Sequence, residues 1–356
     1  MSEAIRLAFA IPGDLSTPTG GYVYDRRVID LLPDHGVDVR VLALPGSFPF
    51  PSQADLDTTR AALVSVGPDE VILADGLAWG ACPAEFARAT NAPVIALCHH
   101  PLGLEAGLTQ DQARAMIDNE RAILAASDHV IVTSNATRAT LIDEFAVVAH
   151  AITVAEPGVE RAPPARGSGS TSVHIIAVGS IVQRKGYDIF VDALARIKDL
   201  DWRLSIVGAL DRAPRAVALL HAQIEAAGLI DRITFTGAAN DAQLAALYDA
   251  SDLFVSASRY EGYGMVLAEA MVRGLPIVST TGGAAAETVP DDAALKVPPE
   301  DVEALSLALR KAISDAPVRG RLAAAALAAS DKLPTWNSAA MTIARVVRDV
   351  HEKARR

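Results

Sequence analysis

The stretch that decides the fold reads Ser256-Ala-Ser-Arg-Tyr-Glu-Gly-Tyr-Gly-Met-Val-Leu-Ala-Glu-Ala-Met271. The apolar residues 252–256 that lead into it predict a short buried strand. Two glycines then let the backbone turn abruptly from strand into helix. The helical pattern starts at Met265 and stops at Gly274-Leu-Pro276, a glycine followed by a proline. We therefore expect a helix that begins at the carboxyl end of a strand.

The first turn of this helix has the properties of an anion site. Its leading N–H groups have no partner inside the helix, and the positive end of the helix dipole favours a phosphate there. The residues predicted to bind a diphosphate in this way are Gly262, Tyr263, Gly264, Met265 and Val266.

Two carboxylates flank the predicted phosphate position. Glu269 lies one turn into the helix, roughly 6 Å from the phosphate at ~1.5 Å rise per residue, where a carboxylate suits the diol of a ribose. Glu261 precedes the helix, on the side where the other end of a nucleotide-diphosphate ligand would lie. On spacing alone, two ordinary surface glutamates, one of them complementing the helix dipole, are an equally good interpretation.

The spacing from Glu261 to Glu269, read as E-G-Y-G-M-V-L-A-E-A-M, resembles the signature of the family 4 retaining glycosyltransferases. These enzymes have the two-domain GT-B fold. The resemblance implies that Glu269 holds the ribose of a nucleotide and that Glu261 contacts hydroxyls of the donor sugar. It covers most of the chain, is specific at 179–186 and 256–287, and is looser before residue 160.

Composition limits the other function classes. A chain of 356 residues that is 51% hydrophobic can form two ordinary domains. It has no apolar run of the ~20 residues needed to span a bilayer, no signal-peptide pattern, and two cysteines, which predicts a cytoplasmic protein. Residues 1–160 contain 21 Asp and Glu against nine Arg and no Lys. Nucleic acid and anionic membrane surfaces are therefore poor partners.

The first half of the chain alternates strands with helices, which predicts a parallel sheet that binds ligands at the carboxyl ends of its strands. Its first loop carries Gly20 and Gly21, where a phosphate could approach, but the G-x-G-x-x-G order of a dinucleotide dehydrogenase is missing. The family has a Gly-Gly at this loop, and a plain flexible turn is the alternative. The expected strands are Ile5–Ala10, Val37–Leu44, Glu70–Ala74, Pro93–Cys98 and His129–Thr133.

Two of these strands end in residues that can carry chemistry. Adjacent histidines, His99 and His100, follow a buried strand and favour a functional role. The resemblance implies that one of them contacts the donor sugar, and we favour His99. Asp75 ends another strand and is a weaker candidate for acceptor contact or for base chemistry on the acceptor hydroxyl.

No metal site is expected. Asp55-Leu-Asp57 spells D-x-D, but these residues open a predicted helix whose first turn favours negative charge. No spacing of histidines and cysteines suggests zinc. We therefore expect neither a metal nor another cofactor, with a nucleotide-diphosphate sugar as co-substrate.

Residues 156–171 are rich in Pro, Gly and Ser and predict an interdomain connector, after which a second alternating series begins. Its first loop contains Lys185, where a cation would stabilise charge on a departing phosphate; a solvated lysine is the alternative. The resemblance favours the binding role, because Lys185-Gly186 matches half of the family's Arg-…-Lys-Gly pair. Ser180 stands where an arginine is usual, and Arg184 is a candidate to replace it.

Three further segments resemble parts of the family. Gly237 and Ala238 match a turn whose backbone meets the nucleobase. Gly283 belongs to a Gly-Gly-x-x-Glu loop that would line the sugar–phosphate pocket, although a simple glycine turn is the alternative. The family's last helix returns to the first domain, and Trp336 would anchor that crossing.

These observations predict an α/β protein of the GT-B fold, in which two Rossmann-like, doubly wound parallel-sheet domains face a central cleft. Its parts would be an acceptor domain at 1–160, a nucleotide-sugar donor domain at 161–335, and a C-terminal helix at 336–356 packing back on the first domain. The predicted function is metal-independent, retaining hexosyl transfer from a nucleotide sugar to an acceptor hydroxyl. A related GT-B epimerase or phosphorylase and a non-catalytic nucleotide-sugar-binding partner subunit are the alternatives. The sequence leaves the base open among UDP, GDP and ADP, and the acceptor among glycan, lipid-linked and small molecules.

Overall fold

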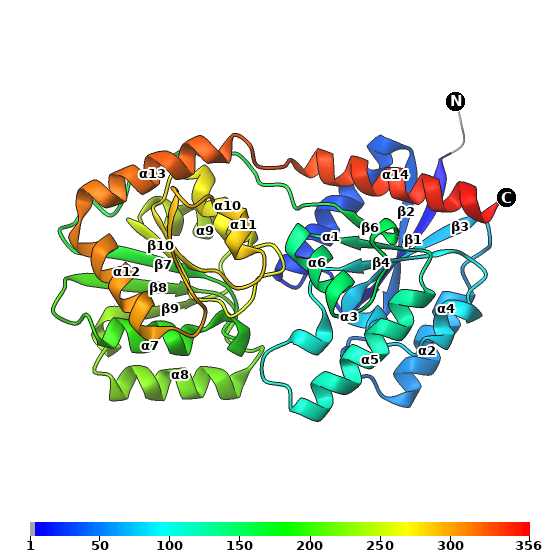
Figure 1. Cartoon of the computed structure of the whole chain (residues 1–356), viewed down its shortest axis with the longest axis horizontal. Helices are drawn as coiled ribbons and strands as arrows, with labels where there is room; N and C mark the ends of the chain where they lie inside the picture. Colours follow the sequence, from blue (N-terminus) through cyan, green and yellow to red (C-terminus); the bar gives the residue numbers. More distant parts are fainter. Residues whose placement is uncertain (1–3) are drawn as a thin grey trace. The chain divides into compact units, whose positions relative to one another are not determined.

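The computed structural model describes residues 4–356, which form two compact units (Figure 1). One unit combines the chain up to Gly158 with Pro334–Arg356, and the other is Val159–Leu333. Each unit contains a six-stranded sheet whose paired strands are all parallel. The expected GT-B class, with two doubly wound parallel sheets, is confirmed.

The sheet of the first unit has the strand order β2-β1-β3-β4-β5-β6. Its central strands are near-continuous apolar runs because helices cover both faces. Helices α2 to α6 lie over one face, and α1 and α14 pack on the other. The elements are β1 Ile5–Pro12, α1 Gly20–Leu31, β2 Val37–Leu44, α2 Gln53–Val64, β3 Glu70–Asp75, α3 Gly76–Trp79, α4 Glu85–Ala89, β4 Val94–Cys98, α5 Gln110–Ala126, β5 His129–Val132, α6 Asn135–Asp143, β6 Ile152–Val154 and α14 Trp336–Ala354.

The sheet of the second unit has the order β12-β11-β10-β7-β8-β9. One apolar cluster joins it to α7, α8 and α12, and another joins it to α9, α10 and α13. The elements are β7 Val173–Val178, α7 Tyr187–Ala195, β8 Trp202–Val207, α8 Pro214–Ala226, β9 Ile233–Gly237, α9 Asp241–Asp249, β10 Leu253–Ser256, α10 Met265–Val272, β11 Ile277–Thr280, α11 Ala285–Thr288, β12 Ala294–Val297, α12 Val302–Ser314 and α13 Ala316–Ser330.

Each sheet has one point where the strand order reverses. It lies between β1 and β3 in the first sheet and between β7 and β10 in the second. The loops that follow such a pair of strands leave toward opposite faces, which opens a crevice at the carboxyl ends of the strands. In the second unit, these two loops contain Lys185 and Glu261.

Most predicted elements appear within two residues of their expected ends. The strands β6 and β12 were not predicted; they have three and four residues, and each lies at an edge of its sheet. The expected connector is also more firmly attached than predicted. Ala165 N–H donates to Arg273 O at 2.8 Å, and Ser168 N–H donates to Asp252 Oδ1 at 2.9 Å, so this segment is fastened to the second unit.

The last helix returns to the first unit, as expected (red in Figure 1). It starts in a capping box in which the Thr335 and Ser338 side chains each accept from the other's backbone N–H. The Trp336 ring meets Tyr24 of α1 edge-on at 5.9 Å between centroids. Along its length α14 packs on α1, β1 and β3.

A close backbone crossing where α14 begins gives the first testable prediction. A Cβ added to Gly158 would lie 2.0 Å from Trp336 N and 2.5 Å from Thr335 C. Because both are backbone atoms, no side chain can move to relieve the clash. We expect Gly158→Ala to lower the free energy of unfolding by about 1–3 kcal/mol, the usual cost of overpacking.

Gly320 in α13 serves as the control, since a Cβ there meets nothing within 4 Å. Gly320→Ala should stabilise the protein by about 0.5–1 kcal/mol, because alanine favours helix. Urea denaturation of both variants measures the two effects. Equal stabilities for Gly158→Ala and wild type would contradict the packing argument.

Candidate active site

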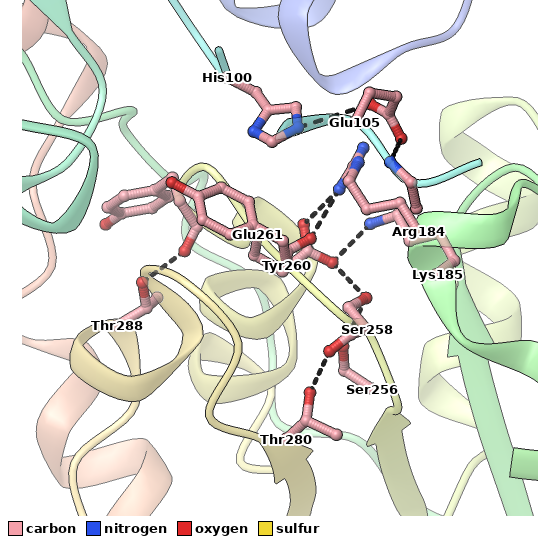
Figure 2. Close-up of polar contacts among 12 residues, drawn as sticks. His100, Glu105, Arg184, Lys185, Ser256, Ser258, Tyr260, Glu261, Thr280 and Thr288 are labelled. Carbon is pink, nitrogen blue, oxygen red and sulfur yellow. Dashed lines mark hydrogen bonds and ion pairs between the residues drawn. The ribbon is translucent and has the colours of Figure 1, made fainter. Parts of the chain in front are cut away.

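An ion pair joins the two loops at the switch point of the second sheet. Lys185 Nζ lies 2.7 Å from Glu261 Oε1, and the side chains are 15% and 7% exposed (Figure 2). Lys185 ends a short 3-10 turn after β7, and Glu261 lies in the loop between β10 and α10. Two residues that the sequence predicted as catalytic are therefore in direct contact.

Backbone and side-chain contacts hold these loops together. Gly186 has φ +64°, and a Cβ there would lie 2.0 Å from Ala257 O, so only glycine allows this approach. Arg259 N–H donates to Arg184 O at 2.7 Å. The Arg259 guanidinium also binds both carboxylate oxygens of Asp188, at 2.9 and 2.7 Å. The position of Lys185 relative to Glu261 is thus fixed by the fold.

Glu261 is a charged carboxylate in a buried place. Burial disfavours its charge, but Lys185 and then Arg184 lower its pKa to about 2. Ser258 Oγ adds a hydrogen bond to Oε1 at 2.5 Å. Behind it, Thr280 Oγ1 donates to Ser258 O (Figure 2). At neutral pH the site therefore combines one negative charge with two positive ones.

Arg184 is the second cation of this site. Its Nη1 donates to Tyr260 O at 2.8 Å and lies 3.6 Å from Glu261 Oε2. Ser180, where the family usually has an arginine, lies half-buried in the same loop. A cation from position 184 thus stands beside Lys185 although position 180 lacks one.

The segment predicted to bind a diphosphate leads into α10. The helix begins at Met265, and its N-cap Gly264 has φ +91°. Leu267 N–H makes the first turn's bond to Gly264 O, so the N–H groups of Met265 and Val266 precede the helical pattern. Tyr263 is held by its carbonyl, which accepts from Thr288 Oγ1 (Figure 2). Gly262, Tyr263 and Gly264 connect Glu261 to the helix, and Met265 and Val266 begin it.

The glycine loop after β11 is brought to the same place. Glu261 N–H donates to Gly282 O at 3.1 Å, and Ala284 N–H donates to Glu261 O at 2.8 Å. Gly283 forms an isolated parallel bridge with Glu261. The Gly-Gly loop therefore supports the backbone of the acidic residue.

Glu269 lies one turn into α10 and is held by residues that the sequence did not indicate. Its Oε2 accepts a 2.9 Å hydrogen bond from the hydroxyl of Tyr248 in α9. Arg273 donates to Glu269 O, and its guanidinium lies 4.5 Å from the centroid of the Tyr248 ring. Burial raises the pKa of Glu269, and the hydrogen bond from Tyr248 opposes that rise. The hydroxyl of Tyr248 thus orients the Glu269 carboxylate from one side.

Two predicted contacts with the nucleobase lie elsewhere on the second unit. Gly237 ends the edge strand β9 and Ala238 follows it, and Gly237 O accepts from Gly208 N–H at 3.0 Å. The structure does not include them in the hydrogen-bonded cluster of Lys185 and Glu261. Their role stays a prediction.

In the first unit, the ends of β3 and β4 and the helix α1 bring together a histidine and two acids. His99 Nε2 lies 3.0 Å from Asp25 Oδ1 and 3.6 Å from Asp75 Oδ2. Asp75 is 2% exposed, and its Oδ1 accepts from Leu77 N–H as the cap of α3. Burial, and then Asp25, raise the pKa of Asp75 to about 7. Asp25, on the buried face of α1, was not predicted.

The other predicted residues of this unit lie beside that cluster. Gly20 and Gly21 form the first turn of α1, and a Cβ on Gly21 would lie 3.3 Å from His99 Cδ2. His100 turns to a different acid, with Nε2 3.6 Å from Glu105 Oε2 (Figure 2). The two adjacent histidines therefore have different surroundings.

The D-x-D sequence lies at a helix start, as predicted. Asp55 accepts the Ser52 N–H in a capping box, and Asp57 accepts from Gln53. Among residues 4–356, Asp25, Asp75 and His99 are the group whose ligand atoms lie within 4.8 Å of one another, a spacing that a metal ion could also use. The 3.0 Å contact of His99 with Asp25 has the length of a hydrogen bond.

Sequence reasoning missed the residues that support the site, namely Asp25, Tyr248, Ser258 and Arg259. Asp25 had a signal, since it is an acid between Tyr24 and Val28 on the apolar face of a helix. Tyr248 had none, because its contact with Glu269 spans 21 residues and two elements.

Comparison with known proteins assigns the family. Two doubly wound parallel sheets, with a last helix that returns to the first, define the GT-B class. A family model described as glycosyl transferases group 1 matches residues 159–328, and one described as glycosyltransferase family 4 matches residues 35–162. This chain belongs to the group 1, family 4 glycosyltransferases.

Relatives of known function are distant. The chain is 27% identical to mannosylfructose-phosphate synthase of Agrobacterium fabrum, over 65% of this chain and 55% of that protein. It is 30% identical to the lipopolysaccharide core biosynthesis mannosyltransferase LpsB of Rhizobium meliloti, over 64% of this chain and 66% of that protein. The matches thus span less than two thirds of either relative. Sucrose-phosphate synthase from Thermosynechococcus elongatus shares the fold, with a TM-score of 0.80 at 21% identity over 98% of this chain and 100% of that one.

Within the described residues, the structure contains no helix that is both long and apolar enough to cross a membrane.

The buried ion pair gives the second prediction. Removing one partner leaves the other charge buried and unpaired, so Lys185→Met and Glu261→Gln should each lower the free energy of unfolding by about 3 kcal/mol. The double variant leaves neither charge, and its loss should be smaller than the sum of the two by about 2 kcal/mol. Denaturation of the four proteins gives this coupling energy; strictly additive losses would show that the pair does not interact.

Proposed function

We propose that this protein is a metal-independent, retaining glycosyltransferase that moves a hexosyl group from a nucleotide-diphosphate sugar to an acceptor hydroxyl. The observation that carries the proposal is the contact of Lys185 with Glu261 beside the start of α10. A cation, an acid and a helix N-terminus stand together there, and Glu269 follows one turn later. This is the arrangement needed to hold a diphosphate between a ribose and a sugar.

Each group has a proposed role. Lys185, Arg184 and the first N–H groups of α10 would stabilise the negative charge that grows on the departing diphosphate. Glu269, oriented by Tyr248, would bind the ribose diol. Glu261 would accept from sugar hydroxyls, which its charged state allows. Since Glu261 already contacts Lys185, an incoming diphosphate would have to share that lysine with it.

The substrates follow from chemistry and from relatives. The second unit would be the donor domain, and the first unit would hold the acceptor. The resemblance to the family implies that His99 contacts the donor sugar. The names of the matched relatives, a mannosyltransferase and a mannosylfructose-phosphate synthase, support hexose donors, mannose above all. Retention of configuration is inferred from the family. Both cysteines are buried free thiols, which is compatible with the reducing cytoplasm that we propose as its compartment.

A non-catalytic nucleotide-sugar-binding subunit is the second candidate, favoured by Ser180 in place of the usual arginine. Arg184 beside Lys185 argues against it, because two cations remain at the site. Incubation with mannose and glucose donors of UDP, GDP and ADP decides between the two. Release of nucleotide diphosphate, with transfer to an acceptor, supports the enzyme. Tight binding without release supports the subunit, and a change in the sugar of the donor itself would instead indicate an epimerase.

The third prediction concerns Lys185. Its loss removes an electrostatic stabiliser of the leaving group, so Lys185→Ala should lower kcat by ~10²-fold or more. The control is Lys311→Ala, since Lys311 is exposed on α12. Initial rates of nucleotide diphosphate release measure both variants. An unchanged kcat for Lys185→Ala would exclude Lys185 from catalysis.

The fourth prediction concerns Glu269. A charged hydrogen-bond partner of the ribose contributes about 1.5–3 kcal/mol, so Glu269→Ala should weaken nucleotide diphosphate binding roughly tenfold to hundredfold. Glu303→Ala, at an exposed position of α12, is the control. Calorimetry gives both affinities, and wild-type affinity for Glu269→Ala would remove it from the ribose site.

A further inference from the structure

His99, in the first unit, is flanked by two acids that the proposed reaction does not use directly. His99 Nε2 faces Asp25 Oδ1 at 3.0 Å and Asp75 Oδ2 at 3.6 Å. Asp25 is 0% exposed and Asp75 is 2% exposed, whereas the side chain of His99 is 21% exposed. The imidazole is therefore partly open to a ligand, whereas the two acids are closed to solvent.

The packing of the ring fixes which edge is presented. The atoms of His99 nearest to a Cβ on Gly21 would be Cδ2, Nε2 and Cγ, at 3.3, 3.7 and 3.8 Å. Tyr24 meets the ring edge-on at 5.2 Å. Since the Cγ–Cδ2–Nε2 edge lies against α1, the Nδ1 atom lies on the side of the ring that faces away from α1. A side chain at position 21 would displace the ring.

The charges around the ring favour its protonated form. Two buried carboxylates this close cannot both be ionised without a cation between them. Asp25 Oδ1 contacts the imidazole, whereas Asp25 Oδ2 has no hydrogen-bond partner among the described residues. Burial disfavours a charged imidazole, but Asp25 and then Asp75 raise the pKa of His99 above its usual value. The positive end of α1 is close by, and the two acids offset its repulsion.

The acids on the other segments near the histidines contact groups other than His99. Glu120 of α5 accepts from Leu102 N–H and Gly103 N–H, at 2.8 and 2.9 Å, and so holds the loop that follows the histidines. Glu105 faces His100. From α1 the ring meets Asp25 and the phenol of Tyr24, and from the end of β3 it meets Asp75.

We propose that Asp25 and Asp75 are positioning residues, which keep His99 as a doubly protonated imidazolium and turn its Nδ1–H toward the substrate. The inference rests on the proposed function, because the substrate is a sugar nucleotide or its acceptor. The imidazolium would donate to an oxygen of that substrate, whether a hydroxyl or a phosphate oxygen. Loss of its proton at high pH would then remove this hydrogen bond and lower activity.

Histidine NMR of the full chain is the fifth prediction and tests the inference without substrate. The sequence has eight histidines, so His99→Gln assigns the His99 signal. In wild type, His99 should stay protonated at pH 7. In Asp25→Asn, its titration should move down by about one pH unit, a tenfold lower protonated fraction above the midpoint. Asp30→Asn, at an exposed position of the same helix, is the matched control and should leave it unchanged.

The pH profile of kcat/KM provides the second readout. Its alkaline limb should move down with the titration of His99 in Asp25→Asn and stay in place in Asp30→Asn. Asp75→Asn gives an independent variant should Asp25→Asn not fold.

A neutral His99 at pH 7 in wild type, or stoichiometric binding of Mn²⁺ or Zn²⁺ lost in Asp25→Asn, would overturn the proton-holding role. If the titration of His99 moved in Asp25→Asn but the alkaline limb of kcat/KM did not, the proposed hydrogen bond from His99 to the substrate would be overturned. Inactivity of the wild type toward every donor, with the NMR result intact, would reject the proposed function instead.

Discussion

The site depends on one buried ion pair, between Lys185 and Glu261, which lie 76 residues apart in the chain. Neither charge would be tolerated in that place alone, so each loop is held there by the other's charge. The pairing follows from topology. The strand order of the second sheet reverses between β7 and β10, and the loops after these two strands meet at the reversal. The order of the six strands in the sheet thus determines that Lys185 and Glu261 meet.

The first sheet applies the same principle with different residues. Its reversal lies between β1 and β3. The start of α1 brings Gly21, and the end of β3 brings Asp75, to the ring of His99, which follows β4. In both units a basic group is held by buried carboxylates. The two carboxylates differ in their pKa. Lys185 and Arg184 lower the pKa of Glu261 to about 2, whereas burial and Asp25 raise the pKa of Asp75 to about 7 beside His99.

The fold could be predicted because its signals are local. Apolar runs, capping residues and turn glycines recur along the chain with the regularity of alternating strands and helices. The first residues of the site were also predictable, since strand ends and a helix start carry Lys185, Glu261 and His99. Their supporting residues were not, because Tyr248, Asp188 and Asp25 reach the site through side-chain contacts that leave no periodic trace. The short edge strand β12 escaped for a related reason, since pairing with β11 stabilises it more than its own sequence does.

The route of the chain through the two units has a consequence for biogenesis. The second unit is one continuous segment, whereas the first receives α14 only after residue 333. That helix covers part of the first sheet at β1 and β3, with eight buried side chains along its length. During synthesis, the part of the first sheet that α14 will cover therefore stays exposed until that helix leaves the ribosome, although the second unit, made before it, can already close its own core.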